Sequence, residues 1–301
     1  KIPNMPAAAQ FMWDQVQKTD FSQRKKILAD QIRSESPDII GIQEATIWYC
    51  KAHFWSKKTE VFNFTSELLD ELGGEYAIAE KNGVQANNPG YSIGPIPFLT
   101  TVHDPKTFQK LFGQNDADCG FQIGDALIIK KSLKQYVNAV GNSEYKDVYK
   151  VVPTLMEIYR GYSWADITVQ GTNVRFVTTH LESLWDAKKV PKAADQARQL
   201  VEDLKSTQSP IVVIGDFNSD PRDPRPADAP NGPCDPLYWE SVLRSPQKNE
   251  KDMREIATWL PVLNDTALVA PTYWNINATD SNLYQNCAKD STQLLGIVTT
   301  N

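Results

Sequence analysis

The chemistry of this chain is best indicated by the stretch Ser209-Pro210-Ile211-Val212-Val213-Ile214-Gly215-Asp216-Phe217-Asn218-Ser219-Asp220-Pro221, an apolar strand that ends in a polar cluster. Side chains alternate in direction along a strand, so Asp216 and Asn218 lie on the same face. A carboxylate can orient a water molecule or take its proton, while a neighbouring amide can hold a phosphate or water oxygen. The pair therefore suits a metal-assisted attack on phosphorus. Taken alone, the same residues fit an ordinary turn equally well.

Two further strand ends carry the polar groups that such a site needs. The run Pro37-Asp38-Ile39-Ile40-Gly41-Ile42-Gln43-Glu44 ends in a carboxylate, and the run 174–183 carries His180. Each residue taken alone is more often structural than functional. Laid side by side, however, strands that end in Glu, His and Asp/Asn form a hard oxygen site for a divalent cation beside an imidazole. The two remaining histidines lie in irregular segments and are interpreted as structural or surface residues: His53 and His103.

In their order and spacing, the three segments resemble the endonuclease/exonuclease/phosphatase superfamily, which includes deoxyribonuclease I, abasic-site endonucleases, neutral sphingomyelinases and inositol-phosphate phosphatases. The resemblance covers about Thr19 to Asp220 and includes the strand 124–130, Arg160-Gly161-Tyr162 and the helix 194–200. It implies an α/β fold, a four-layer α/β/β/α sandwich of two mixed sheets flanked by helices. We expect one domain over residues 1–301, with a long insertion at about 83–122 that borders the cleft.

The resemblance also implies a role for each polar residue. Glu44 would bind a divalent metal ion, Mg²⁺ or Mn²⁺, which polarises the phosphoryl group and offsets the developing charge. Asp216 would align or activate the attacking water, and Asn218 would hold a phosphate oxygen. His180 would contact or protonate the phosphate oxygens. These roles together predict a metal-dependent phosphoesterase.

The chain departs from the family pattern at both ends. Members open with a strand that bears an Asn and close with a late Asp and an Asp-His pair. Here Asn4 has no strand-like surroundings, and residues 293–301 contain neither carboxylate nor imidazole. The chain is therefore either a fragment of an active enzyme or a divergent relative that binds a phosphorylated ligand in the same cleft without hydrolysing it. We favour the fragment, because loss of a whole strand would expose unpaired backbone groups in a core sheet.

The charge balance leaves the substrate class open. The net charge is −6, and the basic clusters, such as residues 24–26 and 188–189, are short. Proteins that bind polyanions strongly usually carry a basic stripe. Candidate substrates are nucleic acid, a phospholipid headgroup or a small phosphoester, so nuclease and sphingomyelinase-like activities stay open. The sequence has no apolar run long enough for a membrane span, and we expect a monomer.

Cysteines and sequons indicate the compartment. The four cysteines are widely spaced and form no C-x-x-C motif, which argues against a zinc cluster and allows one or two disulfides: Cys50, Cys119, Cys234 and Cys287. Three Asn-x-Ser/Thr triplets are candidate glycosylation sites: Asn63, Asn264 and Asn277. The sequence does not begin with Met. Together these features predict a secreted glycoprotein whose signal segment has been removed.

Overall fold

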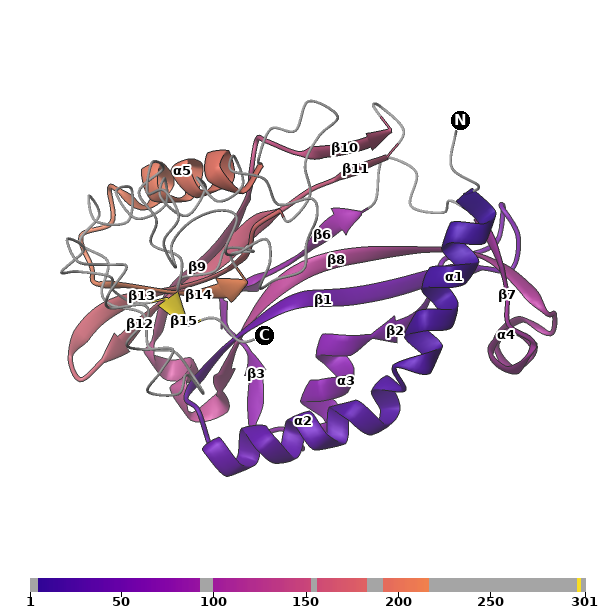
Figure 1. The fold of residues 1–301 in the computed structure, drawn as a ribbon. Coiled ribbons are helices and arrows are strands. Elements are labelled where there is room, and N and C mark those ends of the chain that lie inside the picture. The colour runs from indigo at the N-terminus through magenta and orange to yellow at the C-terminus, as the bar shows by residue number, and fades with distance from the viewer. Residues whose placement is uncertain (1–4, 93–99, 153–155, 183–191, 217–296, 299–301) are drawn as a thin grey trace, which may run out of the picture.

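Two stacked β-sheets form the centre of the molecule (Figure 1). The computed structural model describes residues 5–92, 100–152, 156–182, 192–216 and 297–298. In the first sheet the strand order is β2-β1-β8-β3, and β6 and β7 also pair with β8. Its strands are β1 (Ile39–Lys51), β2 (Thr59–Asn63), β3 (Tyr76–Ile78), β6 (Asn87–Ser92), β7 (Thr100–His103) and β8 (Asp116–Lys130).

The second sheet has the order β15-β14-β13-β12-β9 and mixes parallel with antiparallel pairs. Its strands are β9 (Val137–Glu144), β12 (Gly161–Val169), β13 (Thr172–His180), β14 (Ile211–Asp216) and β15 (Ile297–Val298). Two small hairpins lie beside the sheets: β4 (Glu80–Lys81) with β5 (Val84–Gln85), and β10 (Tyr149–Val152) with β11 (Met156–Ile158). The predicted insertion at 83–122 holds β5, β6, β7, a short helix and the start of β8.

An apolar core joins the two sheets. Leu127 and Ile129 of β8 pack against Ala165 and Ile167 of β12, and all four side chains are fully buried. These residues are two positions apart on each strand, so they share the inner face of their sheet. Burial of this face on both sides fixes how the sheets stack.

The helices cover the outer faces, which completes the four layers. They are α1 (Met5–Lys18), α2 (Phe21–Glu35), α3 (Phe64–Glu71), α4 (Pro105–Phe112) and α5 (Lys192–Leu204), with the 3₁₀ helix η1 at Lys131–Tyr136. On α5, Ala197, Leu200 and Leu204 recur at helical spacing and pack on the second sheet. On the other side, α2 and α3 pack on the first sheet around Ile128. The four-layer sandwich implied by the resemblance is confirmed.

Local sequence signals set the helix ends. The predicted helix at 66–72 is α3, which begins at Asn63, whose side chain accepts a hydrogen bond from the Ser66 N–H. It ends before Gly73, which has a φ of +64°. Within the described ranges, no helix is long and apolar enough to cross a bilayer.

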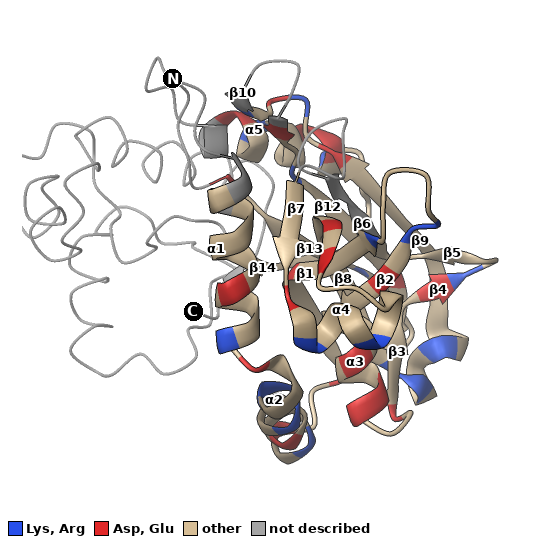
Figure 2. Ribbon diagram, turned by 90° about the vertical axis from the view of Figure 1, so that its right-hand side faces the viewer, with Lys and Arg blue, Asp and Glu red and all other residues tan. Residues whose placement is uncertain are grey.

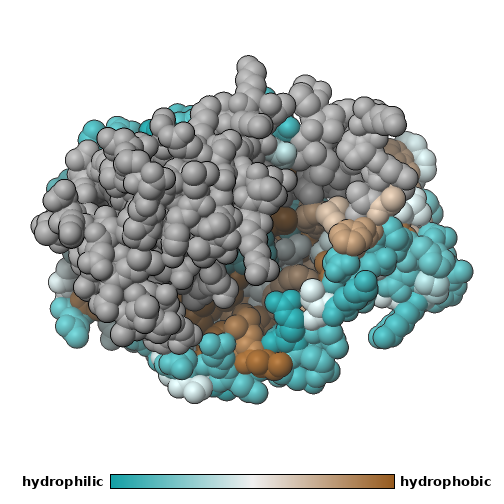
Figure 3. Space-filling view, viewed as in Figure 1, coloured by the Kyte–Doolittle hydropathy of each residue, from teal (hydrophilic) through white to brown (hydrophobic). Residues whose placement is uncertain are grey.

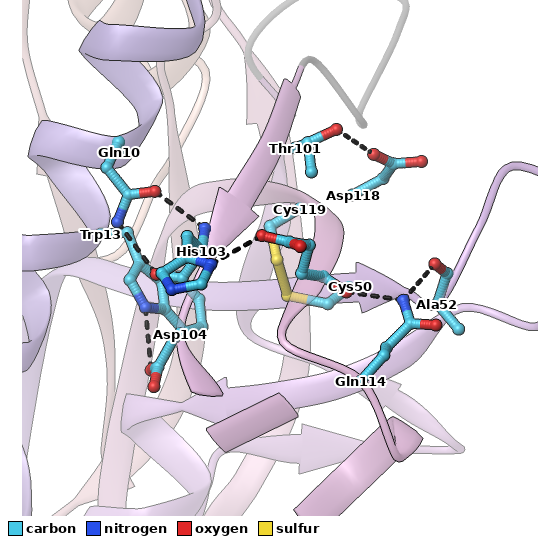
Figure 4. The surroundings of a disulfide bond; sticks show 11 residues. Gln10, Trp13, Cys50, Ala52, Thr101, His103, Asp104, Gln114, Asp118 and Cys119 are labelled. Atoms are coloured by element: carbon cyan, nitrogen blue, oxygen red, sulfur yellow. Dashed lines mark hydrogen bonds and ion pairs between the residues drawn. A yellow bond between two sulfur atoms is a disulfide. The ribbon is translucent and has the colours of Figure 1, made fainter. Parts of the chain in front are cut away.

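The far end of the first sheet is tied together by a disulfide (Figure 4). Cys50 of β1 and Cys119 of β8 lie opposite each other in the strand register and are bonded. Trp13 of α1 packs edge-to-face on Trp48 next to them, at a centroid distance of 5.3 Å. The other two cysteines of the sequence lie outside the described residues.

Candidate active site

Two of the predicted site residues are neighbours at the C-terminal ends of two parallel strands in the second sheet. Strands β13 and β14 run parallel, and their register pairs His180 with Asp216. The His180 Nε2 atom lies 3.7 Å from Asp216 Oδ2. The imidazole is only 6% exposed, whereas 42% of the Asp216 side chain is exposed. The carboxylate therefore faces solvent while the imidazole is held inside the protein.

Two glycines allow the strands around these strand ends to approach closely. A Cβ atom on Gly215 would lie 2.2 Å from the Thr179 carbonyl oxygen. A Cβ atom on Gly41 would lie 2.8 Å from Thr178 Oγ1 on the facing sheet. Real Cβ contacts are longer than this, so a larger residue at either position would push the strands apart. These glycines explain why each motif carries Gly shortly before its carboxylate.

Glu44 lies on a β-bulge within β1, which continues to Lys51, so the prediction that a strand ends at Glu44 is wrong. Between the pairs Ile42–Ala126 and Ala45–Gly124, two residues of β1 oppose one residue of β8. Glu44 has a φ of 54°, in the left-handed region, and it is exposed. A bulge turns a side chain away from the regular alternation of the strand, and bulges recur beside active sites. The carboxylate has no hydrogen bond or ion pair with any described residue, so its oxygens are available to a ligand.

A hydrogen bond between the sheets places this bulge opposite the end of β13. The Gln43 side-chain amide donates to Thr178 Oγ1 at 2.8 Å, and Thr178 is fully buried. Gln43 immediately precedes Glu44, and Thr178 lies two residues before His180. This contact therefore joins the β1 segment that carries Glu44 to the part of β13 that carries His180. Asn218 lies two residues past the end of β14, outside the described residues.

Arg160 fixes the orientation of His180, although the sequence analysis gave this arginine no role. A guanidinium nitrogen of Arg160 lies 2.7 Å from His180 Nδ1, and Arg160 Nε lies 3.3 Å from Glu182 Oε2. A guanidinium can only donate, so Nδ1 accepts, and the neutral imidazole carries its proton on Nε2, toward Asp216. Burial, reinforced by the Arg160 charge, lowers the pKa of His180 to about 3.

A second unpredicted acid lies within β8. Asp125 is the residue opposite the Glu44 bulge, and it is 2% exposed. Its Oδ1 atom has no hydrogen-bond partner among the residues that the structure describes. Burial raises the pKa of Asp125 well above its ordinary value, and the Arg160 charge offsets only part of this effect. The sequence feature that could have indicated this acid is a single carboxylate inside the apolar run 124–130.

A cavity of about 360 Å³ lies elsewhere, between α3 and the strands β1 and β3. Of the site residues described above, its lining contains only Asp125. The chemistry-bearing side chains of the three motifs are absent from it. We therefore place the candidate active site at the strand ends and not in this cavity.

The oxygen donors of the candidate site fit a divalent cation in kind. Mg²⁺ and Mn²⁺ bind carboxylate oxygens, and the exposed Glu44 carboxylate is such a donor. Among the residues that the structure describes, no group of three or more His, Cys, Asp or Glu lies close enough together to hold a metal ion. Any further ligands of the metal ion must therefore come from other residues of the chain, from water or from the substrate.

Removal of the Arg160 guanidinium should destabilise the protein. The Arg160→Met change takes the cation away from Glu182, whose side chain is fully buried, and breaking a buried ion pair typically costs about 3–5 kcal/mol. Urea unfolding should show a loss of at least about 3 kcal/mol. The control is Arg198→Met, which breaks the half-exposed pair with Asp195 and should cost less than about 1 kcal/mol. Equal losses in the two variants would contradict a buried, structural ion pair.

Two stacked sheets with helices packed on their outer faces define a four-layer sandwich, in which one sheet carries the Glu44 bulge and the other the paired His180 and Asp216. The chain belongs to the endonuclease/exonuclease/phosphatase family, whose sequence profile matches residues 13–286. The resemblance drawn from the three motifs is thereby confirmed. Members of this family typically hydrolyse phosphoester bonds, and they generally use divalent metal ions.

Several solved structures are similar to this chain at low sequence identity. A mannosyl-6-phosphatase from Bacteroides thetaiotaomicron VPI-5482 is 15% identical, with 69% of this chain and 61% of that chain covered and a TM-score of 0.36. A family protein from Leptotrichia buccalis is 16% identical, with 66% and 61% covered and a TM-score of 0.40. Another from Bacteroides thetaiotaomicron is 17% identical, with 69% and 59% covered and a TM-score of 0.37. This chain thus spans about three fifths of their length. No curated protein matches it.

Proposed function

We propose that this protein is a divalent-metal-dependent phosphoesterase that hydrolyses a phosphodiester or phosphomonoester by in-line attack of water. The observation that carries the proposal is the pairing of His180 with Asp216 at the ends of β13 and β14. Membership of a family of phosphoester hydrolases supports the same reaction class.

In this proposal the exposure and charge of Asp216 and His180 give each residue a different role. Asp216 is half exposed, so it can align an incoming water molecule and accept its proton. His180 is neutral at physiological pH because its pKa is about 3. It therefore donates the Nε2 hydrogen to a phosphate oxygen, as a fixed hydrogen-bond donor and not as a charged acid. Arg160 holds it in this orientation.

The role proposed for Glu44 is to hold the cation. A bound Mg²⁺ or Mn²⁺ would polarise the phosphoryl group and offset the charge that develops on it. Asn218 remains the proposed holder of a phosphate oxygen. The exposed, unpartnered carboxylate of Glu44 supports its assignment, because its oxygens need not leave another partner to bind a ligand.

The test is hydrolysis of p-nitrophenyl phosphate, bis-p-nitrophenyl phosphate, single-stranded DNA and sphingomyelin by purified protein, with EDTA or with added Mg²⁺ or Mn²⁺. The proposal expects product release from at least one substrate only when metal is present. Absence of metal-dependent release from all four, with retained binding of a phosphorylated ligand, would favour the alternative of a non-catalytic binding protein.

The charge pattern of the described surface does not favour a polyanion as substrate. Figure 2 shows Lys and Arg beside Asp and Glu on α2 and only acidic residues on α3, without a continuous basic stripe on the described part in this view. Proteins that bind long nucleic acids usually present such a stripe. Short or small phosphoesters and lipid headgroups therefore rank above long nucleic acids in the proposal.

We also propose a secreted, glycosylated monomer. The Cys50–Cys119 disulfide supports secretion, because disulfides persist mainly in oxidising compartments. Asn264 and Asn277 lie outside the described residues, and Asn63 is the capping residue of α3. The extent of the domain over residues 1–301 likewise stays a prediction.

A further inference from the structure

The loop between β1 and β2 exposes two adjacent aromatic side chains. Phe54 is 70% exposed, and Trp55, at 87%, is the most exposed large hydrophobic residue in the described part of the chain. Their rings meet edge-to-face at a centroid distance of 4.8 Å. Single exposed apolar residues are common, but adjacent exposed aromatics form a continuous apolar surface that typically marks a contact site. In Figure 3 the described surface is mostly hydrophilic along its outline.

The two aromatics are the central residues of a closed turn. The Ser56 N–H donates to the His53 carbonyl oxygen at 2.9 Å. The Ser56 hydroxyl accepts from the His53 N–H at 2.9 Å and donates to the His53 carbonyl oxygen at 2.7 Å. Lys51 Nζ donates to the Phe54 carbonyl oxygen at 3.3 Å. The turn thus satisfies these polar backbone groups internally, which lowers the cost of moving it out of water.

The base of the turn is anchored to the sheet. The Cys50–Cys119 disulfide lies immediately before it, and the Gln114 side chain donates to the Ala52 carbonyl oxygen at 2.6 Å (Figure 4). A turn that is ordered before binding loses little conformational entropy on binding. The protein therefore presents Phe54 and Trp55 on a rigid support.

The turn is basic within an acidic protein. Residues 51–58, which we call the aromatic turn, contain three lysines and no acidic residue, whereas the whole chain has a net charge of −6. Lys57 and Lys58 are exposed, and Lys58 Nζ lies 4.2 Å from the centroid of the Tyr49 ring. The neighbouring acids, Glu60, Asp116 and Asp118, lie on the strands at its base. The aromatic turn therefore combines an apolar tip with flanking positive charge.

We propose that the aromatic turn is a membrane-docking surface, which places Phe54 and Trp55 in the interfacial region of a bilayer that contains anionic phospholipids. Aromatic side chains, Trp above all, favour the membrane–water interface, and lysines beside them attract anionic headgroups. A strand of unpaired nucleic acid suits the turn less well. Successive bases need parallel stacking faces, whereas these two rings are perpendicular, at 89°.

Co-sedimentation with vesicles of phosphatidylcholine and phosphatidylserine tests the proposal. The wild-type protein should bind, and Trp55→Ala should weaken partitioning about tenfold or more, because it removes a large part of the buried apolar area. Lys57→Gln should weaken it about fivefold, and only on vesicles that contain phosphatidylserine. The matched control is Phe11→Ala, which removes an aromatic side chain that is 63% exposed on α1 and should leave partitioning unchanged.

Tryptophan fluorescence separates the other possible occupants. The emission that is lost in Trp55→Phe reports on Trp55, and it should be quenched by acrylamide in free protein and protected by vesicles. Protection in free protein would mean that the chain itself covers Trp55, and it would overturn the proposal. Protection by oligo-dT but not by vesicles would assign the turn to nucleic acid. A loss of partitioning in Phe11→Ala equal to that in Trp55→Ala would also overturn the membrane-docking proposal. These readouts measure binding and do not depend on hydrolysis.

Discussion

Replacement of Asp216 by Asn should lower the turnover of metal-dependent phosphoester hydrolysis by about 10²- to 10⁴-fold, the usual contribution of a general base. Asn has nearly the same shape as Asp but cannot accept the proton of the attacking water. The side chain lies at the end of β14 and is 42% exposed, so the substitution should leave the sheet intact. Turnover of bis-p-nitrophenyl phosphate at saturating Mg²⁺ measures the effect.

The matched control for this variant is Asp30→Asn, which changes a carboxylate on α2 whose side chain is 76% exposed. It should keep wild-type turnover. Both variants should also keep the wild-type midpoint of thermal unfolding, so that lost turnover reflects chemistry and not folding. If Asp216→Asn hydrolysed the substrate within a few-fold of the wild-type rate, Asp216 would have no part in proton transfer.

The strand-end motifs could be predicted from sequence because their signal is local. An apolar run that breaks into Gly-Asp shows where β14 ends, and alternation shows which residues share a face. The break at Gln43-Glu44 is not a strand end, because β1 continues to Lys51. The stacking of the two sheets that carry these motifs became predictable through the family resemblance. The pairing of His180 with Asp216 then follows from a parallel register.

The bulge at Glu44 and the role of Arg160 could not be predicted in the same way. The sequence around Glu44 indicates a strand end, whereas β1 continues to Lys51, and its extra residue becomes visible only against the partner β8. Arg160 and His180 are 20 residues apart, and they meet because β12 and β13 pair antiparallel next to them. Such contacts depend on register, which no local pattern specifies.

The disulfide shows the same limit. The sequence allowed one or two bridges among four cysteines but did not determine their pairing. Cys50 and Cys119 are 69 residues apart, and the β1–β8 register brings them directly opposite each other. Topology, and not cysteine spacing, selected this pair.

Acid should destabilise the folded protein through His180. Its pKa is about 3 in the folded state and 6.5 for the ordinary group, so the unfolded chain takes up the proton first as the pH falls. The stabilising contribution is therefore complete above pH 6.5 and is lost between pH 6.5 and pH 3. At 1.36 kcal/mol per pH unit, the free energy of unfolding should fall by about 3 kcal/mol from this residue between pH 7 and pH 4.

The variant His180→Asn isolates this contribution. It cannot titrate, so its free energy of unfolding should fall by about 3 kcal/mol less than that of the wild-type protein between pH 7 and pH 4. The comparison uses this difference because loss of the Arg160 contact lowers stability at every pH. The control is His53→Asn, which changes an exposed histidine and should keep the wild-type acid dependence. Urea unfolding at both pH values measures all three proteins. Identical acid dependence in His180→Asn and the wild-type protein would show that His180 is not held neutral by burial beside Arg160, and its proposed role as a fixed hydrogen-bond donor would fail with it.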